Sequence, residues 1–148
     1  MQKLIRQFKY KYSRELCELF GEILRERIVR WGLTADVVVP VPTSRSRLRD
    51  RGFNQAELLS IKICSKKVLD CLVRLDSHSA QAKLSRAGRV KNLRGMVEIR
   101  DGFNVVGKRA LLVDDVATTL STMKECARVL KSAGASSVCG VVIARGEC

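Results

Sequence analysis

The apolar residues of this chain follow two patterns, one with helical spacing and one in short continuous runs. Between residues 13 and 31, large apolar side chains recur every three or four positions, which predicts an amphipathic leading helix over 13–31. Ser13 is the expected N-cap of this helix, and Gly32 is the expected end. Similar spacing predicts helices over 55–66, capped by Asn54, and over 122–132, followed by Gly134.

Short apolar runs predict strands at 37–42, 68–75, 96–100, 110–113 and 138–144. Continuous apolar runs are typical of parallel strands that are buried on both faces. Strands and helices alternate along the chain, so we predict an α/β fold with a parallel sheet flanked by helices. The length of 148 residues fits a single domain, 1–148.

One long stretch, 76–95, contains almost no large apolar side chains and many basic and polar ones. Loops of this length are often functional, and we expect a flexible basic lid loop here. A plain surface insertion is the alternative. If the stretch is a lid, its candidate ligand-binding residues are Gln81, Lys83, Arg89 and Asn92. The chain's one histidine, His78, also lies here and is not expected to be catalytic.

Asp114 and Asp115 follow the apolar run 110–113, and a hydroxyl-rich turn then leads into the helix over 122–132. Ligands of open α/β sheets bind at the carboxyl ends of the strands. Carboxylates there can accept hydrogen bonds from sugar hydroxyls, and the helix start with its hydroxyls can hold a phosphate. The alternative is a pair of solvated acids that end a strand.

A second candidate ligand-binding element follows the run 37–42. Residues 43–54 read as a cationic loop with arginines at alternate positions 45, 47, 49 and 51. Because guanidinium groups fit phosphate oxygens in pairs, the loop is a candidate site for a diphosphate. A mobile basic loop without such a role is the alternative.

The overall charge favours an anionic partner. The chain has 28 Lys and Arg against 15 acids, a net charge of +13, which suits nucleic acid, nucleotide or phosphorylated sugar without choosing among them. Lysines alternate with Phe8, Tyr10 and Tyr12, a pattern that fits single-stranded nucleic acid or simply a solvated first helix.

The cysteines and the hydropathy bear on the compartment and on metals. None of the six cysteines forms a C-x-x-C pair, which argues against a zinc site, and most are expected to be buried free thiols. No apolar run approaches the roughly 18 residues of a membrane span. The start of the chain lacks the apolar core of a signal peptide, so we expect a soluble cytoplasmic protein.

The stretch 113–122, Val-Asp-Asp-Val-Ala-Thr-Thr-Leu-Ser-Thr, resembles the phosphoribosyl-diphosphate (PRPP) motif of type I phosphoribosyltransferases. Further blocks resemble the ComF branch of that family, which is associated with natural competence: Pro40-Val41-Pro42, Arg51 to Ala56, Gln81 with Leu84-Ser85-Arg86, Arg89, and Asn92 to Gly95. The resemblance covers nearly the whole chain. The N-terminal four-cysteine zinc module of longer ComF members is absent from this sequence.

The resemblance implies binding of PRPP with Mg²⁺ and transfer of ribose 5-phosphate to an unknown acceptor, with nucleobases among the options. Asp114 and Asp115 would bind the ribose hydroxyls directly or through the magnesium shell, and would stabilise positive charge on C1 as catalytic residues. The diphosphate would lie at Arg45, Arg49 or Arg51. The 5′-phosphate would be held by Thr118, Thr119, Leu120, Ser121 and Thr122.

One position departs from the motif, because Leu120 stands where the family pattern has glycine. Either the turn does not require a positive φ, or phosphate affinity is reduced. Two other functions therefore remain as alternative hypotheses: a non-catalytic PRPP-fold protein, and a factor that handles single-stranded DNA during uptake. The sequence leaves the oligomeric state open, with a dimer among the options.

Overall fold

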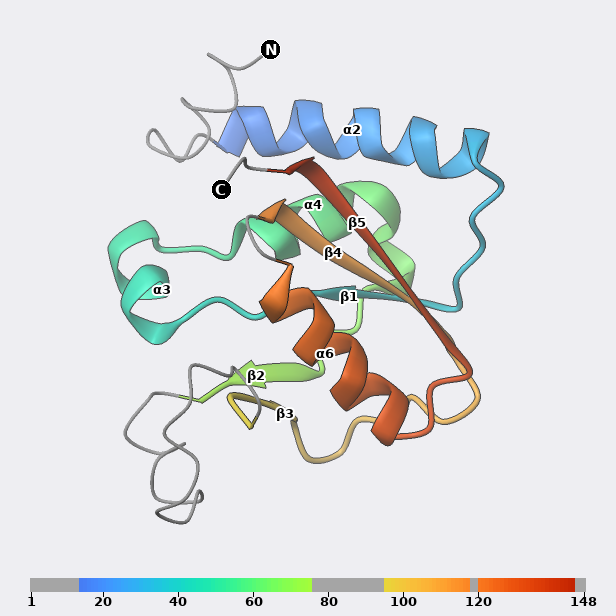
Figure 1. Ribbon diagram of the computed structural model, residues 1–148. Coiled ribbons are helices and arrows are strands. Elements are labelled where there is room, and N and C mark those ends of the chain that lie inside the picture. The colour runs from blue at the N-terminus through green and yellow to red at the C-terminus, as the bar shows by residue number, and fades with distance from the viewer. Residues whose placement is uncertain (1–13, 76–94, 118–119, 146–148) are drawn as a thin grey trace.

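The computed structural model describes residues 14–75, 95–117 and 120–145, and Figure 1 shows the arrangement of its elements. Its centre is a parallel sheet with the strand order β1-β4-β5, formed by Val37–Pro40, Arg109–Ala117 and Ser137–Arg145. The central strand β4 pairs with β1 from Val37↔Ala110 to Pro40↔Val113, and with β5 over its whole length. The predicted α/β fold with a parallel sheet is confirmed.

The two faces of this sheet support two separate apolar clusters, because successive side chains of a strand point to opposite faces. Ala110 and Leu112 of β4 pack with α6, Ser121–Ser132, and with the short strands β2, Leu72–Arg74, and β3, Val97–Ile99. Leu111 and Val113 pack instead with α2, Arg14–Arg30, and with α4, Gln55–Cys64. Burial on both faces explains why β1 and the first part of β4 read as continuous apolar runs.

The leading helix was predicted over 13–31, and α2 occupies Arg14–Arg30, with Gly32 in the left-handed conformation (φ 65°) just beyond it. The proposed cap, Ser13, lies outside the described residues. α2 packs closely on α4, since a Cβ placed on Gly21 would lie 2.5 Å from Cβ of Lys62. Gly21 therefore sets how near the two helices can approach.

The start of β4 is fixed to the segment before β1 by a charged pair. The backbone N–H of Arg109 donates to Oδ2 of Asp36 at 2.8 Å, and its guanidinium donates to both carboxylate oxygens and to Oγ1 of Thr34. These hydrogen bonds hold the pKa of Asp36 well below its usual range. The pair aligns the two strands whose opposite ends carry the candidate site.

Two predicted strands differ from expectation. A 3₁₀ turn at Ser65–Lys67 precedes the run 68–75. The run itself forms a single parallel bridge of Val68 to Val38 and then a short strand β2, Leu72–Arg74. β2 pairs antiparallel with β3, Val97–Ile99, in a separate two-stranded sheet. Backbone hydrogen bonds such as Arg100 N–H to Cys71 C=O extend this pairing, so that only the start of the run 68–75 contacts the main sheet.

The stretch 43–54 is not a loop, because it contains the helix α3, Arg45–Arg51. Ser44 caps this helix by accepting from the N–H of Arg47 at 3.3 Å, and Gly52 ends it in the left-handed conformation (φ 78°). Serine before and glycine after a basic stretch are ordinary helix boundary signals. The alternate spacing of the arginines obscured them.

Candidate functional site

The two acids lie inside β4 rather than beyond it, because this strand extends to Ala117 instead of ending at Val113. β1 has already ended at Pro40, opposite Val113, so the last part of β4 has lost its neighbour on that side. Each carboxylate accepts from the next backbone N–H: Asp114 from Asp115 at 2.9 Å, and Asp115 from Val116 at 2.7 Å. The two acids thus lie on the part of β4 that extends beyond the end of β1.

Burial makes the charge on Asp114 costly. Desolvation, and secondarily the adjacent charge of Asp115, raise the pKa of Asp114 to about 7, although Arg47 acts in the opposite direction. Neighbouring residues of a strand face opposite sides, so Asp114 lies on the α6 side and Asp115 on the α2 side. Burial, and secondarily the charge of the nearer acid, raises the pKa of Cys126 beside Asp114 and that of Cys17 beside Asp115. A cation at this edge would favour the ionised form of Asp114.

The N-terminus of α6 meets the same site. Ser121 and Thr122 lie in its first turn, and the N-cap position is Leu120, which offers no side-chain cap to the helix. Leu120 adopts φ 56° and ψ 4°, the only positive φ of a non-glycine among the described residues. The turn therefore does require the conformation that glycine adopts freely, and the leucine holds it at a cost of about 1–2 kcal/mol.

The helical form of α3 divides its four arginines between two sides. Residues two apart on a helix point about 200° apart, whereas residues four apart share a side. Arg47 and Arg51 line the pocket beside the acids, whereas Arg45 and Arg49 are not among its lining residues. Of the three arginines predicted to hold a diphosphate, only Arg51 therefore lies in the pocket.

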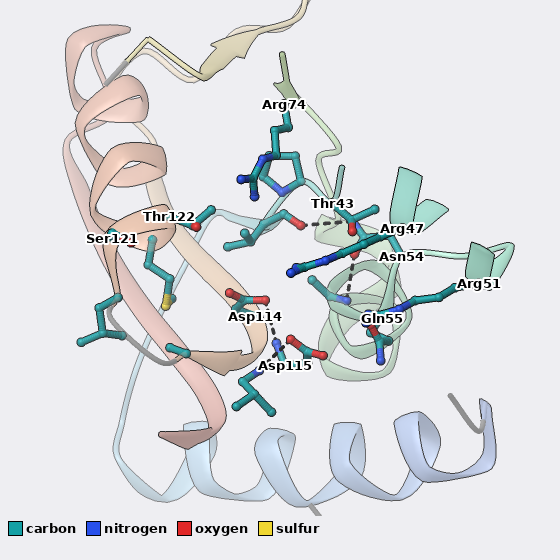
Figure 2. Close-up of a pocket in the computed structure, with 17 residues that line it drawn as sticks. Thr43, Arg47, Arg51, Asn54, Gln55, Arg74, Asp114, Asp115, Ser121 and Thr122 are labelled. Carbon is teal, nitrogen blue, oxygen red and sulfur yellow. Dashed lines mark hydrogen bonds between the residues drawn. The ribbon is translucent and has the colours of Figure 1, made fainter. Parts of the chain in front are cut away.

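These elements enclose a pocket of about 500 Å³ at the carboxyl ends of β1 and β4, shown in Figure 2. Its walls come from the β1 end with α3 and α4 on one side, and from the β4 end with α6 on the other. The predicted residues that it unites are Asp114, Asp115, Leu120, Ser121, Thr122 and Arg51. Residues of α3 thus meet the consecutive elements β4 and α6, which lie far along the chain, at one site.

Two arginines of the pocket were not predicted. Arg47 belongs to α3, and Arg74 is the last residue of β2; both side chains extend over the acids in Figure 2. The helical period would have identified Arg47 had the caps of α3 been recognised. Arg74 reaches the site only because β2 pairs with β3, a contact to which no local sequence signal pointed.

Asn54 ties the start of α4 to the end of β1. Its Oδ1 accepts from the N–H of Ala56 at 3.1 Å, as predicted for the cap of α4, and its Nδ2 donates to the carbonyl of Val41 at 3.1 Å. One side chain therefore both starts α4 and ties it to the end of β1.

Several predicted ligand-binding residues lie outside the described residues: Thr118, Thr119, Gln81, Lys83, Arg89 and Asn92. Within the described ranges, no three His, Cys, Asp or Glu side chains form a group that could hold a metal ion. Asp114 and Asp115 nevertheless fit Mg²⁺, which binds through one or two carboxylates and completes its shell with phosphate oxygens and water. No helix among these residues is long and apolar enough to cross a membrane.

Sequence similarity to curated relatives extends over most of this chain. It is 30% identical to the DNA utilization protein YhgH of Escherichia coli over 93% of the chain and 64% of the relative. It is 28% identical to the competence protein ComFC of Streptococcus pneumoniae over 93% of the chain and 60% of the relative. The chain thus spans somewhat less than two thirds of the length of these relatives.

Solved structures share the fold. The glutamine PRPP amidotransferase from B. subtilis superimposes with a TM-score of 0.59 at 21% identity, over 86% of this chain and 26% of that one. The model of the phosphoribosyl transferase domain family matches residues 15–148. The chain belongs to the phosphoribosyl transferase domain family, and its curated relatives include competence and DNA utilization proteins.

Proposed function

We propose that this protein binds PRPP together with Mg²⁺ and transfers ribose 5-phosphate to an acceptor, with nucleobases among the options. The observation that carries the proposal is the meeting of Asp114 and Asp115, the N-terminus of α6 and the Arg47 guanidinium around one pocket. A ligand with sugar hydroxyls between two phosphorylated ends complements this arrangement, because hydroxyls donate to carboxylates while phosphates accept from helix N–H groups and guanidinium groups.

In the proposed reaction the bond between C1 and the diphosphate oxygen breaks, and the diphosphate leaves with its electron pair. A lone pair of the acceptor forms the new bond to C1, and the proton that the acceptor loses passes to the diphosphate or to water. Asp114 and Asp115 orient the ribose through its hydroxyls, and their charge stabilises the positive charge that develops on C1. Mg²⁺ would neutralise charge on the departing diphosphate. Ser121 and Thr122 hold the 5′-phosphate end while the bonds at C1 change.

Calorimetric titration with PRPP and Mg²⁺ tests the binding, and release of diphosphate in the presence of candidate nucleobases tests the transfer. We expect Asp115→Asn to abolish acceptor-dependent release, with Asp70→Asn, an acid outside the pocket lining, as control. Binding of PRPP without turnover by any base would favour a non-catalytic PRPP-fold protein. Absence of heat and of thermal stabilisation would remove both functions.

A second candidate function is the handling of single-stranded DNA. Arg45 and Arg49 are absent from the pocket lining, and they add a basic surface to a chain with a net charge of +13. The names of the relatives, competence protein and DNA utilization protein, agree with such a role. Fluorescence anisotropy with a labelled oligonucleotide should show binding that weakens steeply between 50 and 200 mM salt, roughly as expected for phosphate contacts. Absence of binding at low salt would eliminate this candidate.

A further inference from the structure

One edge of the main sheet is open among the described residues. β5 is the outermost strand of this sheet, as Figure 1 shows, and within the described ranges it pairs with β4 alone. β5 has 9 residues, and none of those before Arg145 is charged or a proline. Natural edge strands usually carry charges, prolines or bulges that prevent pairing with another chain. Since β5 lacks such charges and prolines, its open edge can accept a further strand.

The helix beside this edge has an exposed apolar flank. α4 packs against β1 and β4, and α2 packs beside α4 in the cluster that also holds Val141 of β5. Gly21 is the residue of α2 that faces α4. Leu19 and Ile23, each two positions from Gly21, point about 200° away from it. They are 50% and 44% exposed, so the flank of α2 that faces away from α4, on the side of β5, is apolar and open to water.

The charges of α2 suit a second copy of the same helix. Its first half carries acids at positions 15, 18 and 22, and its second half carries arginines at positions 25, 27 and 30. Two such helices that lie antiparallel bring unlike halves together, whereas a parallel pair would bring like charges together. A two-fold axis normal to the sheet makes both the α2 helices and the β5 strands antiparallel, so one symmetry operation satisfies both elements.

We propose that two copies of this chain associate about such a two-fold axis, with their β5 strands paired antiparallel and the Leu19 and Ile23 flanks of α2 packed against each other. The two three-stranded sheets then become one continuous sheet. β5 is also the strand that pairs with the acid-bearing end of β4 after β1 has ended, so pairing of its outer edge would hold that segment in place. No ligand takes part, and the proposal therefore does not depend on the proposed function.

Sedimentation equilibrium of the whole chain over about a hundredfold range of protein concentration tests the association, which should be reversible and concentration-dependent. Reducing agent is present, because the exposed Cys139 could otherwise cross-link two copies. Physiological ionic strength screens much of the repulsion that a net charge of +13 on each copy produces.

Ile23→Glu should weaken the association about 10-fold or more, because it places an unpaired charge in the interface. Val29→Glu makes the same kind of change at a residue that is 74% exposed and lies about 120° around α2 from Ile23. This control should leave the association within about 2-fold of the wild type. Leu19→Lys should weaken it as Ile23→Glu does.

An equimolar mixture of Ile23→Glu and Leu19→Lys provides the sharpest test. In the antiparallel arrangement position 19 of one copy lies beside position 23 of the other, so the new carboxylate meets the new ammonium group in the mixed dimer. The mixture should therefore associate more tightly than either variant alone. This recovery would also show that neither variant had lost its fold.

A wild type that stays monomeric over the whole concentration range would overturn the proposal and leave the flank to a different partner. Equal weakening by Ile23→Glu and Val29→Glu would overturn it too, as would a mixture that associates no better than its components. Amide hydrogen exchange of β5 should be slower in the wild type than in Ile23→Glu at the same high concentration. Equal exchange rates would rule out the strand pairing.

Discussion

The Arg47 guanidinium counteracts the buried charge of Asp114: burial and Asp115 raise the pKa of that carboxyl to about 7, and Arg47 is the cation that lowers it. The two side chains come from α3 and β4 and line the same pocket, as Figure 2 shows. An acid held near its midpoint at neutral pH responds strongly to any added cation. The predictions for this site follow from that balance.

The free protein should lose stability as the pH rises because of Asp114. Its pKa is raised in the folded state from 3.8 to about 7, so folding favours the protonated form. The contribution is complete below pH 3.8 and is lost as the pH rises to about 7. Asp114→Asn should therefore lose less stability than the wild type between pH 4.5 and 7.5, by on the order of a few kcal/mol.

Urea unfolding of both proteins at these two pH values measures the effect. Ionic strength is held constant, so that the net charge of +13 is screened equally. Parallel pH profiles for the two proteins would show that Asp114 is not the titrating group.

Arg47→Met should raise the pKa of Asp114 further and weaken the binding of PRPP with Mg²⁺ about 10-fold or more, because a charge-assisted contact is lost. Arg49→Met is the matched control, since it removes the same charge from the same helix at a position outside the pocket lining. Calorimetry on the two variants makes the comparison. Equal losses would mean that general charge attraction, rather than the side of α3, governs binding.

At Leu120, glycine should be more stable than alanine, the reverse of their usual order. Both substitutions remove the partly buried side chain, but only glycine adopts φ 56° without steric cost. We expect Leu120→Gly to exceed Leu120→Ala by about 1 kcal/mol in the free energy of unfolding. Chemical denaturation measures the difference, and an advantage for alanine would show that the turn relaxes when the leucine is removed.

Gly21→Ala should destabilise the protein, although alanine is the better helix former by about 1 kcal/mol. The added Cβ would lie 2.5 Å from Cβ of Lys62, an atom that cannot move without shifting α4. Overpacking of this kind costs about 1–3 kcal/mol, so we expect a net loss of about 1 kcal/mol. Thermal unfolding tests this, with the exposed neighbour Glu22→Ala as control; a higher melting temperature for Gly21→Ala would contradict the packing.

Local patterns identified much of the fold and part of the site. The amphipathic spacing of 13–31, the Asn54 cap and the apolar run before Asp114 correspond to α2, α4 and β4. These signals are carried by neighbouring residues, so the sequence alone contains them. To predict which arginines of α3 face the pocket, the segment has to be recognised as a helix, and the alternate spacing of the arginines does not suggest one.

Other features depend on contacts between distant segments. Arg74 reaches the pocket because β2 pairs with β3, and the open edge of β5 follows from the strand order of the main sheet. The positive φ of Leu120 was one of two alternatives that only the backbone could decide. Long-range pairing, burial and backbone conformation are the properties that sequence patterns leave open.

The pairing of β1 with β4 has a consequence for folding. Asp36 and Arg109, which join the starts of these strands, are 73 positions apart, whereas Arg109 pairs with Ser137 of β5 through the local connection of α6. Closing the longer loop, from Asp36 to Arg109, costs more chain entropy before stabilising contacts can form. We therefore expect the unit β4-α6-β5 to form first and β1 to dock on it later, so that Arg47 and Arg51, which follow β1, reach the pocket last.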